Sequence, residues 1–93
     1  MKLRYERDAL TELDEIFAYI AADDRSAAAR VVEEIEKTAS LIAAVPGIGR
    51  TARLPPLRLF RSGRYLLVYE ITKREVIIHY VRHGARPRPW EGE

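Results

Sequence analysis

Cysteine is absent from the 93 residues of this chain, and methionine and tryptophan each occur once. The lack of cysteine excludes disulfides, thiolate nucleophiles and thiolate metal ligands, and it is compatible with a reducing compartment. No apolar run approaches the about 20 residues of a membrane-spanning helix, and the charged stretch Met1 to Asp8 does not resemble a signal peptide. We therefore expect a cytoplasmic protein that does not enter a membrane.

The sequence also has few residue groups that could bind a metal ion or attack a substrate. Its two histidines, His79 and His83, lie four residues apart on one predicted strand, or about 13 Å, which is too far for a single ion. Ser26, Ser40 and Ser62 do not stand in the Gly-x-Ser-x-Gly pattern of a serine hydrolase. We expect no metal site, no cofactor and no catalytic triad.

Charge is distributed unequally along the chain. Residues 1–45 carry 6 basic and 10 acidic side chains, and residues 46–93 carry 10 basic and 4 acidic ones, which gives −4 and +6. Thirteen of the 16 basic residues are arginine, whose planar fork suits carboxylates and phosphates. The basic half is therefore a candidate surface for an acidic protein or a nucleic acid, unless it is an ordinary solvated surface.

Hydrophobic periodicity predicts a helical hairpin in the first half. Residues 2–5 alternate as a short strand does. A first helix, from Asp8 to about Ala22, has an apolar stripe at spacings of three and four, formed by Leu10, Leu13, Ile16, Phe17 and Ile20. A second helix, capped by Ser26 and ended by Pro46-Gly47, has the stripe Val31, Val32, Ile35, Ala39 and Ile42. The connection is short, so the helices should be antiparallel, with Leu13, Phe17, Ile20, Ile35 and Ile42 facing the core.

The second half has the composition of β-strands. We predict strands at Leu57 to Arg61, Arg64 to Ile71 and Val76 to His83, joined by a Ser62-Gly63 turn and a polar turn at residues 72–75. The fold class is therefore α+β, with the helical hairpin packed on one face of a small antiparallel sheet in the order β-α-α-β-β-β. The length suits a single domain spanning residues 1–93, with a short basic tail from about residue 84.

Alternation along the strands assigns side chains to the two faces of the sheet. The set Tyr65, Leu67, Tyr69 and Ile71 should face the helices, because all four are apolar or aromatic. Leu66 and Val68 should lie on the open face, together with Ile77, His79 and Val81 of the last strand. An exposed apolar sheet face indicates a partner site, unless the C-terminal tail covers it.

Basic and aromatic residues gather in the last third of the chain. They are Arg58, Arg61, Arg64, Arg82, His83, Arg86, Arg88 and Trp90. Arginine beside an aromatic ring is typical of contact with nucleic acid or with an acidic protein, although arginines at strand ends also serve as solubilising residues.

The order and spacing of many residues resemble the RelE/ParE toxin superfamily of type II toxin-antitoxin systems. The resemblance covers almost the whole chain and rests on Leu10, Asp14-Glu15-Ile16, Tyr19-Ile20, Ala28, Ile35, Leu41, Pro46, Gly49-Arg50, Leu57-Arg58, Tyr65, Val68-Tyr69 and Val81-x-His83-Gly84-x-Arg86. It implies a toxin that is neutralised by a co-encoded antitoxin and that takes part in plasmid stabilisation.

Two branches of that superfamily differ in their chemistry. RelE-like toxins cleave messenger RNA on the ribosome, and the resemblance places their basic residues at Leu57, Leu59 and Leu66, which are all apolar here. Only Arg86 stands at the position of a catalytic arginine of RelE-like toxins. The His-Gly-Ala-Arg ending is more similar to ParE, which poisons DNA gyrase without known hydrolysis, although residues 87–89 (Pro-Arg-Pro) depart from that pattern.

The resemblance thus implies a ParE-like toxin that is not an enzyme, binds DNA gyrase, and forms a hetero-oligomer with a ParD-like antitoxin through which it meets DNA only indirectly. One alternative is a RelE-like ribosome-dependent endoribonuclease that uses Arg61, Arg86, His83 or tyrosine residues. Another is an inactive member that retains only antitoxin binding.

Two groups of site residues follow from these arguments. Toxicity is assigned to the C-terminal basic segment, with Arg82, His83, Arg86 and Trp90 as the target-binding residues. Antitoxin binding is assigned to the open sheet face at Leu66 and Val68 and to grooves beside the helices, with contributions from Leu13, Phe17 and Arg58.

Overall fold

A computed structural model describes residues 1–84 of the chain. Its elements are β1 (Lys2–Tyr5), α1 (Arg7–Ala21), α2 (Arg25–Ala44), a short 3-10 turn η1 (Pro46–Ile48), β2 (Arg50–Thr51), β3 (Arg58–Ser62), β4 (Tyr65–Ile71) and β5 (Glu75–His83). Both predicted helices and all four predicted strands are confirmed. No helix within residues 1–84 is long and apolar enough to cross a membrane. Apart from Gly84, the predicted tail lies outside the described residues.

The sheet has five strands in the order β1-β5-β4-β3-β2. Strands β3, β4 and β5 form the predicted antiparallel meander. The expectation of a wholly antiparallel sheet is wrong, because β1 pairs with β5 in parallel, with Tyr5 opposite Ile78. The helical hairpin carries the chain across the sheet after β1, so β1 can lie beside the last strand in the same direction. The two-residue strand β2 was not predicted, and it pairs with β3 at the other edge.

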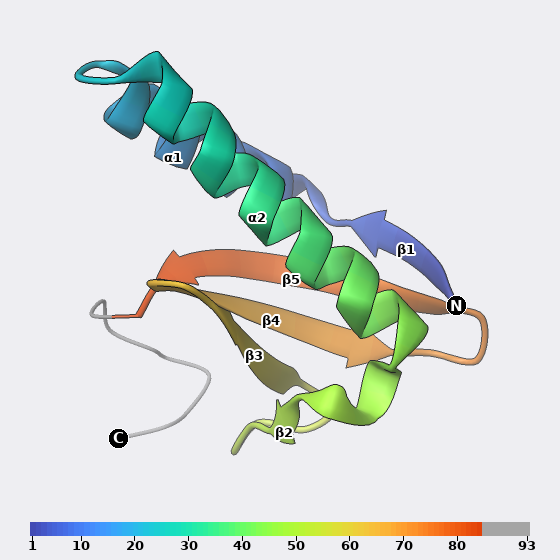
Figure 1. Ribbon diagram of the computed structural model, residues 1–93. Coiled ribbons are helices and arrows are strands. Elements are labelled where there is room, and N and C mark those ends of the chain that lie inside the picture. The colour runs from blue at the N-terminus through green and yellow to red at the C-terminus, as the bar shows by residue number, and fades with distance from the viewer. Residues whose placement is uncertain (85–93) are drawn as a thin grey trace.

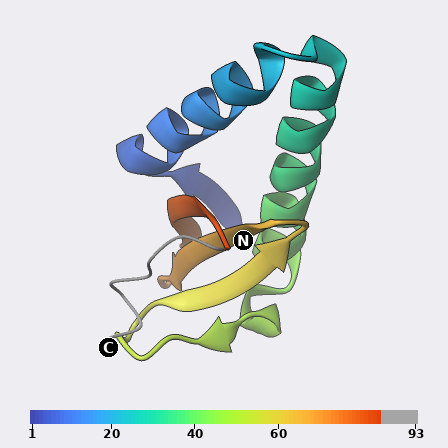
Figure 2. The same ribbon diagram turned by 90° about the vertical axis from the view of Figure 1, so that its left-hand side faces the viewer.

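The two helices cover one face of the sheet (Figure 1). They meet at their connection, at the end farthest from the sheet, and diverge toward it (Figure 2). Asp24 caps α2, since its carboxylate accepts a hydrogen bond from the backbone N–H of Ala27 at 3.0 Å. The prediction of Ser26 as the cap is therefore wrong: the helix already begins at Arg25, and Asp24 is the residue in extended conformation before it.

The main core lies between the helices and the sheet. Its buried members are Ala9, Leu13, Ile35, Ala39, Ile42, Leu67, Tyr69, Val76, Ile78 and Val81. Phe17 and Ile20 were expected there, but they are only partly buried and lie outside this cluster. In α1 the stripe that packs on this core runs through the buried Ala9 and Leu13 and the partly buried Ile16, and Phe17 is one residue, or about 100° of helix, further round.

A second, smaller cluster lies on the sheet face opposite the helices. Leu66 and Val68 are its centre and are 5% and 0% exposed, with Ala52 and Leu59 as the other buried members. Leu57 and Tyr80 pack against it. The assignment of Leu66 and Val68 to the face away from the helices is confirmed, but the expectation that this face is exposed at these two residues is wrong.

A β-bulge in the β4–β5 pairing changes the face assignment of β5. The register passes from Val68 opposite Tyr80 to Tyr69 opposite Ile78, so His79 is the extra residue. Val81 was expected on the open face, but it lies opposite Leu67 and belongs to the main core. Strict alternation fails here because one inserted residue exchanges the two faces of the strand beyond it.

A buried tyrosine holds the loop that follows α2. The Tyr69 hydroxyl donates a hydrogen bond to the carbonyl of Pro46 at 2.7 Å and accepts one from the Gly49 N–H at 2.9 Å. The Arg58 guanidinium donates to the Gly49 carbonyl at 2.8 Å. Burial raises the pKa of Tyr69, and the Gly49 hydrogen bond and the charge of Arg58 offset part of this rise. The loop is thereby fixed to the centre of β4.

Candidate functional site

The predicted target-binding residues begin where β5 ends. Tyr65 stands opposite His83 in the register, and their rings meet edge to face with centroids 5.5 Å apart. The Gly84 N–H donates to the carbonyl of Arg64 at 2.8 Å, which ties the strand end to the β3–β4 turn. His83 is therefore held against the sheet at the point where the chain leaves it.

Arg82 is held from two sides. Its Nε donates to the carboxylate of Glu12 on α1, and its guanidinium carbon lies 5.0 Å from the centroid of the Tyr80 ring. Its side chain is 29% exposed, so much of the cation is shielded. The structure thus brings two of the predicted residues, Arg82 and His83, together at one end of the sheet. Arg86 and Trp90 lie outside the described residues.

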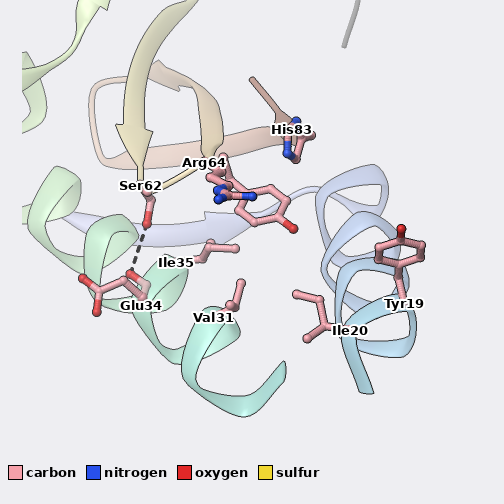
Figure 3. Close-up of a pocket in the computed structure, with 10 residues that line it drawn as sticks. Tyr19, Ile20, Val31, Glu34, Ile35, Ser62, Arg64 and His83 are labelled. Carbon is pink, nitrogen blue, oxygen red and sulfur yellow. Dashed lines mark hydrogen bonds between the residues drawn. The ribbon is translucent and has the colours of Figure 1, made fainter. Parts of the chain in front are cut away.

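A groove opens beside His83, beneath the end of the helical hairpin. It has a volume of about 580 Å³ and lies between α1, α2 and the β3–β4 turn. Figure 3 shows Ile20 from α1, Val31 from α2 and Arg64 from the turn around the same space. The turn itself is held to α2, because the Ser62 hydroxyl donates to the Glu34 carbonyl at 3.4 Å. The groove combines apolar walls with a cation and an imidazole at its rim.

A second groove of about 520 Å³ adjoins the first along β5 and α1. Tyr19, Tyr65 and His83 line both grooves. Tyr19 is 83% exposed, an unusual fraction for a large aromatic side chain, and sequence reasoning did not select it as a binding residue. Its place just outside the apolar stripe of α1, next to Ile20, was the available signal.

The positions that would be basic in a RelE-like toxin come together in the second cluster. Leu57, Leu59 and Leu66 all contribute to it, beside Val68. Arg61 stands opposite Leu66 and is exposed. This face of the sheet therefore has a packed apolar centre.

The residues predicted to bind the antitoxin are not brought into one surface. Leu13 of α1 is buried between the helices and the sheet, whereas Leu66 and Val68 are buried on the opposite face of the sheet. Phe17 is partly buried on α1, and Arg58 binds the loop at Gly49. Antitoxin binding at these five residues stays a prediction.

Residues 1–84 contain no group of three histidine, cysteine, aspartate or glutamate side chains that could hold a metal ion. His79 lies at the bulge, where its Nε2 is 2.9 Å from the Glu70 carboxylate, and His83 contacts Tyr65 instead. The described part of this site lines its two grooves with cationic, aromatic and apolar side chains.

The arrangement of helices and strands has a counterpart among solved structures. A solved structure described as the chromosomal ParDE toxin-antitoxin system from P. aeruginosa superposes with a TM-score of 0.78. The match covers 89% of this chain and 95% of that one at 22% sequence identity, so it shows a shared fold. The match thus defines the class of the chain as a small α+β fold shared with a protein of that structure.

Sequence similarity specifies the family within that class. Residues 3–88 match the family described as the ParE toxin of the type II toxin-antitoxin system, parDE. The chain is also 38% identical over 90 residues to Y4kP, a candidate toxin of Sinorhizobium fredii, a match that covers 95% of this chain and 93% of the relative. The chain belongs to the ParE toxin family.

Proposed function

We propose that this protein is a ParE-like toxin that acts in the cytoplasm by binding and poisoning DNA gyrase, and that a ParD-like antitoxin neutralises it. Membership of the ParE family and the fold shared with a ParDE structure support the toxin class and the antitoxin partner. The choice of binding over catalysis has its own structural support, which lies in the second cluster.

That cluster is the observation that carries the proposal. A nuclease that cleaves a phosphodiester by in-line attack needs several preorganised cations around the transition state. The resemblance to RelE-like toxins would place three such cations at Leu57, Leu59 and Leu66, and these three leucines pack together in the second cluster. Restoring a cationic site would require opening a cluster in which Val68 is completely buried.

The target-binding segment begins with Arg82 and His83 and continues through Arg86 to Trp90. Arginine and tryptophan are the residue types that most often dominate protein interfaces, since one forms bidentate charge-assisted contacts and the other buries a large apolar area. Because His83 and Gly84 are fastened to Tyr65 and Arg64, this segment leaves the sheet from a fixed point.

The antitoxin would bind the apolar surfaces beside the helices and form a hetero-oligomer with the toxin, so that DNA is contacted only through the antitoxin. The groove lined by Ile20, Val31 and Arg64 offers accessible apolar surface for a segment that orders on binding. The contacts predicted at Leu13, Phe17, Arg58, Leu66 and Val68 are part of this proposal, and those at Leu66 and Val68 require the second cluster to open.

The test is controlled expression of the toxin in cells, with DNA breaks and filamentation scored against loss of intact messenger RNA, followed by a cleavage assay with purified DNA gyrase. Arg86→Ala and Trp90→Ala should abolish growth arrest and gyrase-dependent breaks, while Arg30→Ala, an exposed arginine on α2, should leave both unchanged. If Arg61→Ala instead abolishes both growth arrest and a ribosome-dependent cleavage of RNA, the enzyme alternative is established.

A further inference from the structure

Strand β5 loses its neighbouring strand halfway along. The β1–β5 pairing ends with Tyr5 opposite Ile78, and the Glu6 N–H donates the last backbone hydrogen bond to the Ile78 carbonyl at 2.9 Å. The chain then enters α1 at Arg7. Among residues 1–84, no strand continues along this edge of β5, which carries the chain toward the target-binding segment.

A side chain from α1 takes the place of the missing strand. One carboxylate oxygen of Glu12 accepts a hydrogen bond from the Val81 N–H at 2.7 Å, and the other accepts one from the Arg82 Nε. The Glu12 side chain is 17% exposed. Hydrogen bonds to an ionised carboxylate are about twice as strong as those between neutral groups, and both of these act on consecutive residues of β5.

We propose that Glu12 is a positioning residue for the toxic end of the molecule. Its carboxylate fixes the edge of β5 at Val81 and the orientation of the Arg82 side chain, and through them the direction in which the chain leaves the sheet after His83. Glu12 does not itself contact the target. This assignment rests on the proposed function, because it takes the segment that begins at Arg82 as the target-binding segment.

Glu15 offers a matched control. It lies one helical turn further along α1, lines the same groove along β5 as Glu12, and is exposed. Substitutions of Glu15 remove a carboxylate of the same helix and groove, but they leave the Val81 and Arg82 contacts in place. A difference between the two sites therefore reports those contacts and not the general charge of α1.

The first experiment measures order in the full-length protein directly. Amide hydrogen exchange and ¹⁵N relaxation are recorded for wild type, Glu12→Ala and Glu15→Ala. Glu12→Ala should speed exchange at the Val81 amide by roughly tenfold and lower the order of the Arg82 and His83 amides, because a charge-assisted hydrogen bond is lost. Glu15→Ala should change neither. Unchanged exchange and order in Glu12→Ala would overturn the proposal whatever the toxicity of the protein.

The second experiment asks whether Glu12 acts through Arg82. Glutamine at position 12 can still accept from the Val81 N–H but loses the charge that holds Arg82, so Glu12→Gln isolates that pair. We expect growth arrest to need roughly tenfold more induced toxin in Glu12→Gln and at least as much in Arg82→Gln, with the double variant no worse than Arg82→Gln alone. Losses that multiply in the double variant, or full toxicity in Glu12→Gln, would refute positioning through Arg82.

Failure of the proposed function gives a different pattern. If Arg86→Ala and Trp90→Ala both leave toxicity intact, the target-binding segment is wrongly assigned, while the exchange measurement still decides whether Glu12 orders the strand end. If those two variants lose toxicity and Glu12→Gln does not, only the positioning role fails.

Discussion

Gly49 occupies a position in which the structure leaves no room for a side chain. A methyl group built on its α-carbon would stand 2.5 Å from the Tyr69 hydroxyl oxygen, 2.6 Å from the Leu59 carbonyl oxygen and 2.8 Å from a carbon of the Tyr69 ring. Two of these neighbours belong to a fully buried ring and the third to the backbone of β3, so none can yield easily. We predict that Gly49→Ala strongly destabilises the fold.

Two effects lower the free energy of unfolding in Gly49→Ala. Overpacking a close-packed site typically costs about 1 to 3 kcal/mol, and leaving the buried Tyr69 hydroxyl without its Pro46 and Gly49 partners costs a similar amount. The parts overlap, since the ring that must move is the one that loses its bonds, and we expect a total near 3 kcal/mol. A domain of this size is stable by roughly 5 to 15 kcal/mol, so the loss would be a large share of the total.

Urea denaturation followed by circular dichroism measures this effect. With a slope of about 1.5 kcal/mol per molar urea, the midpoint of Gly49→Ala should fall by about 2 M. Gly47→Ala is the matched control, because that glycine is in the same loop and a methyl group there meets nothing within 4 Å. Equal, small shifts for the two variants would show that Tyr69 does not hold this loop as described.

Three further experiments test the core, the cap of α2 and the ionisation of Tyr69. Leu13→Ala should cost about 2 to 5 kcal/mol in unfolding free energy and Phe17→Ala clearly less, since only Leu13 belongs to the main core; the reverse order in urea denaturation would contradict the assigned face of α1. Asp24→Ala should cost about 1 kcal/mol and Ser26→Ala almost nothing, because Asp24 caps α2; thermal unfolding decides. Burial raises the pKa of the Tyr69 hydroxyl above 10.0, so the stabilisation by the protonated hydroxyl is complete below pH 10.0 and is lost as the pH rises above it. Tyr69→Phe removes the titrating group and should flatten this alkaline fall in the free energy of unfolding. Urea denaturation across pH 9 to about 12 measures the effect.

Much of the fold follows from periodicity alone. The apolar spacing of α1 and α2 and the alternation of β4 predict the correct elements and the correct helix-covered face, because burial of one stripe or one parity set leaves a direct pattern in the sequence. The parallel placement of β1 does not follow, since a four-residue strand has no signal for its partner. The sequence also gives no sign of the bulge at His79, and this bulge alone moves Val81 from the predicted face of the sheet to the main core.

The candidate site was predicted in part. The basic and aromatic character of Arg82 and His83 marks them in the sequence, and the structure brings them together at the end of β5. Glu12 was not predicted, because it is one of several acidic residues on α1 and its contacts with Val81 and Arg82 span about 70 positions of the chain. Gly49 was interpreted only as part of a helix stop, since its close approach to Tyr69 depends on tertiary packing.

The single extra residue at the β5 bulge determines on which face of the sheet each following side chain of β5 lies. With His79 inserted, His83 lies on the helix side with Tyr65, and Arg82 lies opposite Leu66 on the other side. Deleting one residue at the bulge while keeping the pairing before it would exchange these assignments, and Arg82 would lose the position at the edge of β5 from which it bonds Glu12 of α1. A substitution within β5 changes one contact at a time, whereas a one-residue deletion at the bulge would exchange the faces on which Arg82 and His83 lie without changing either residue.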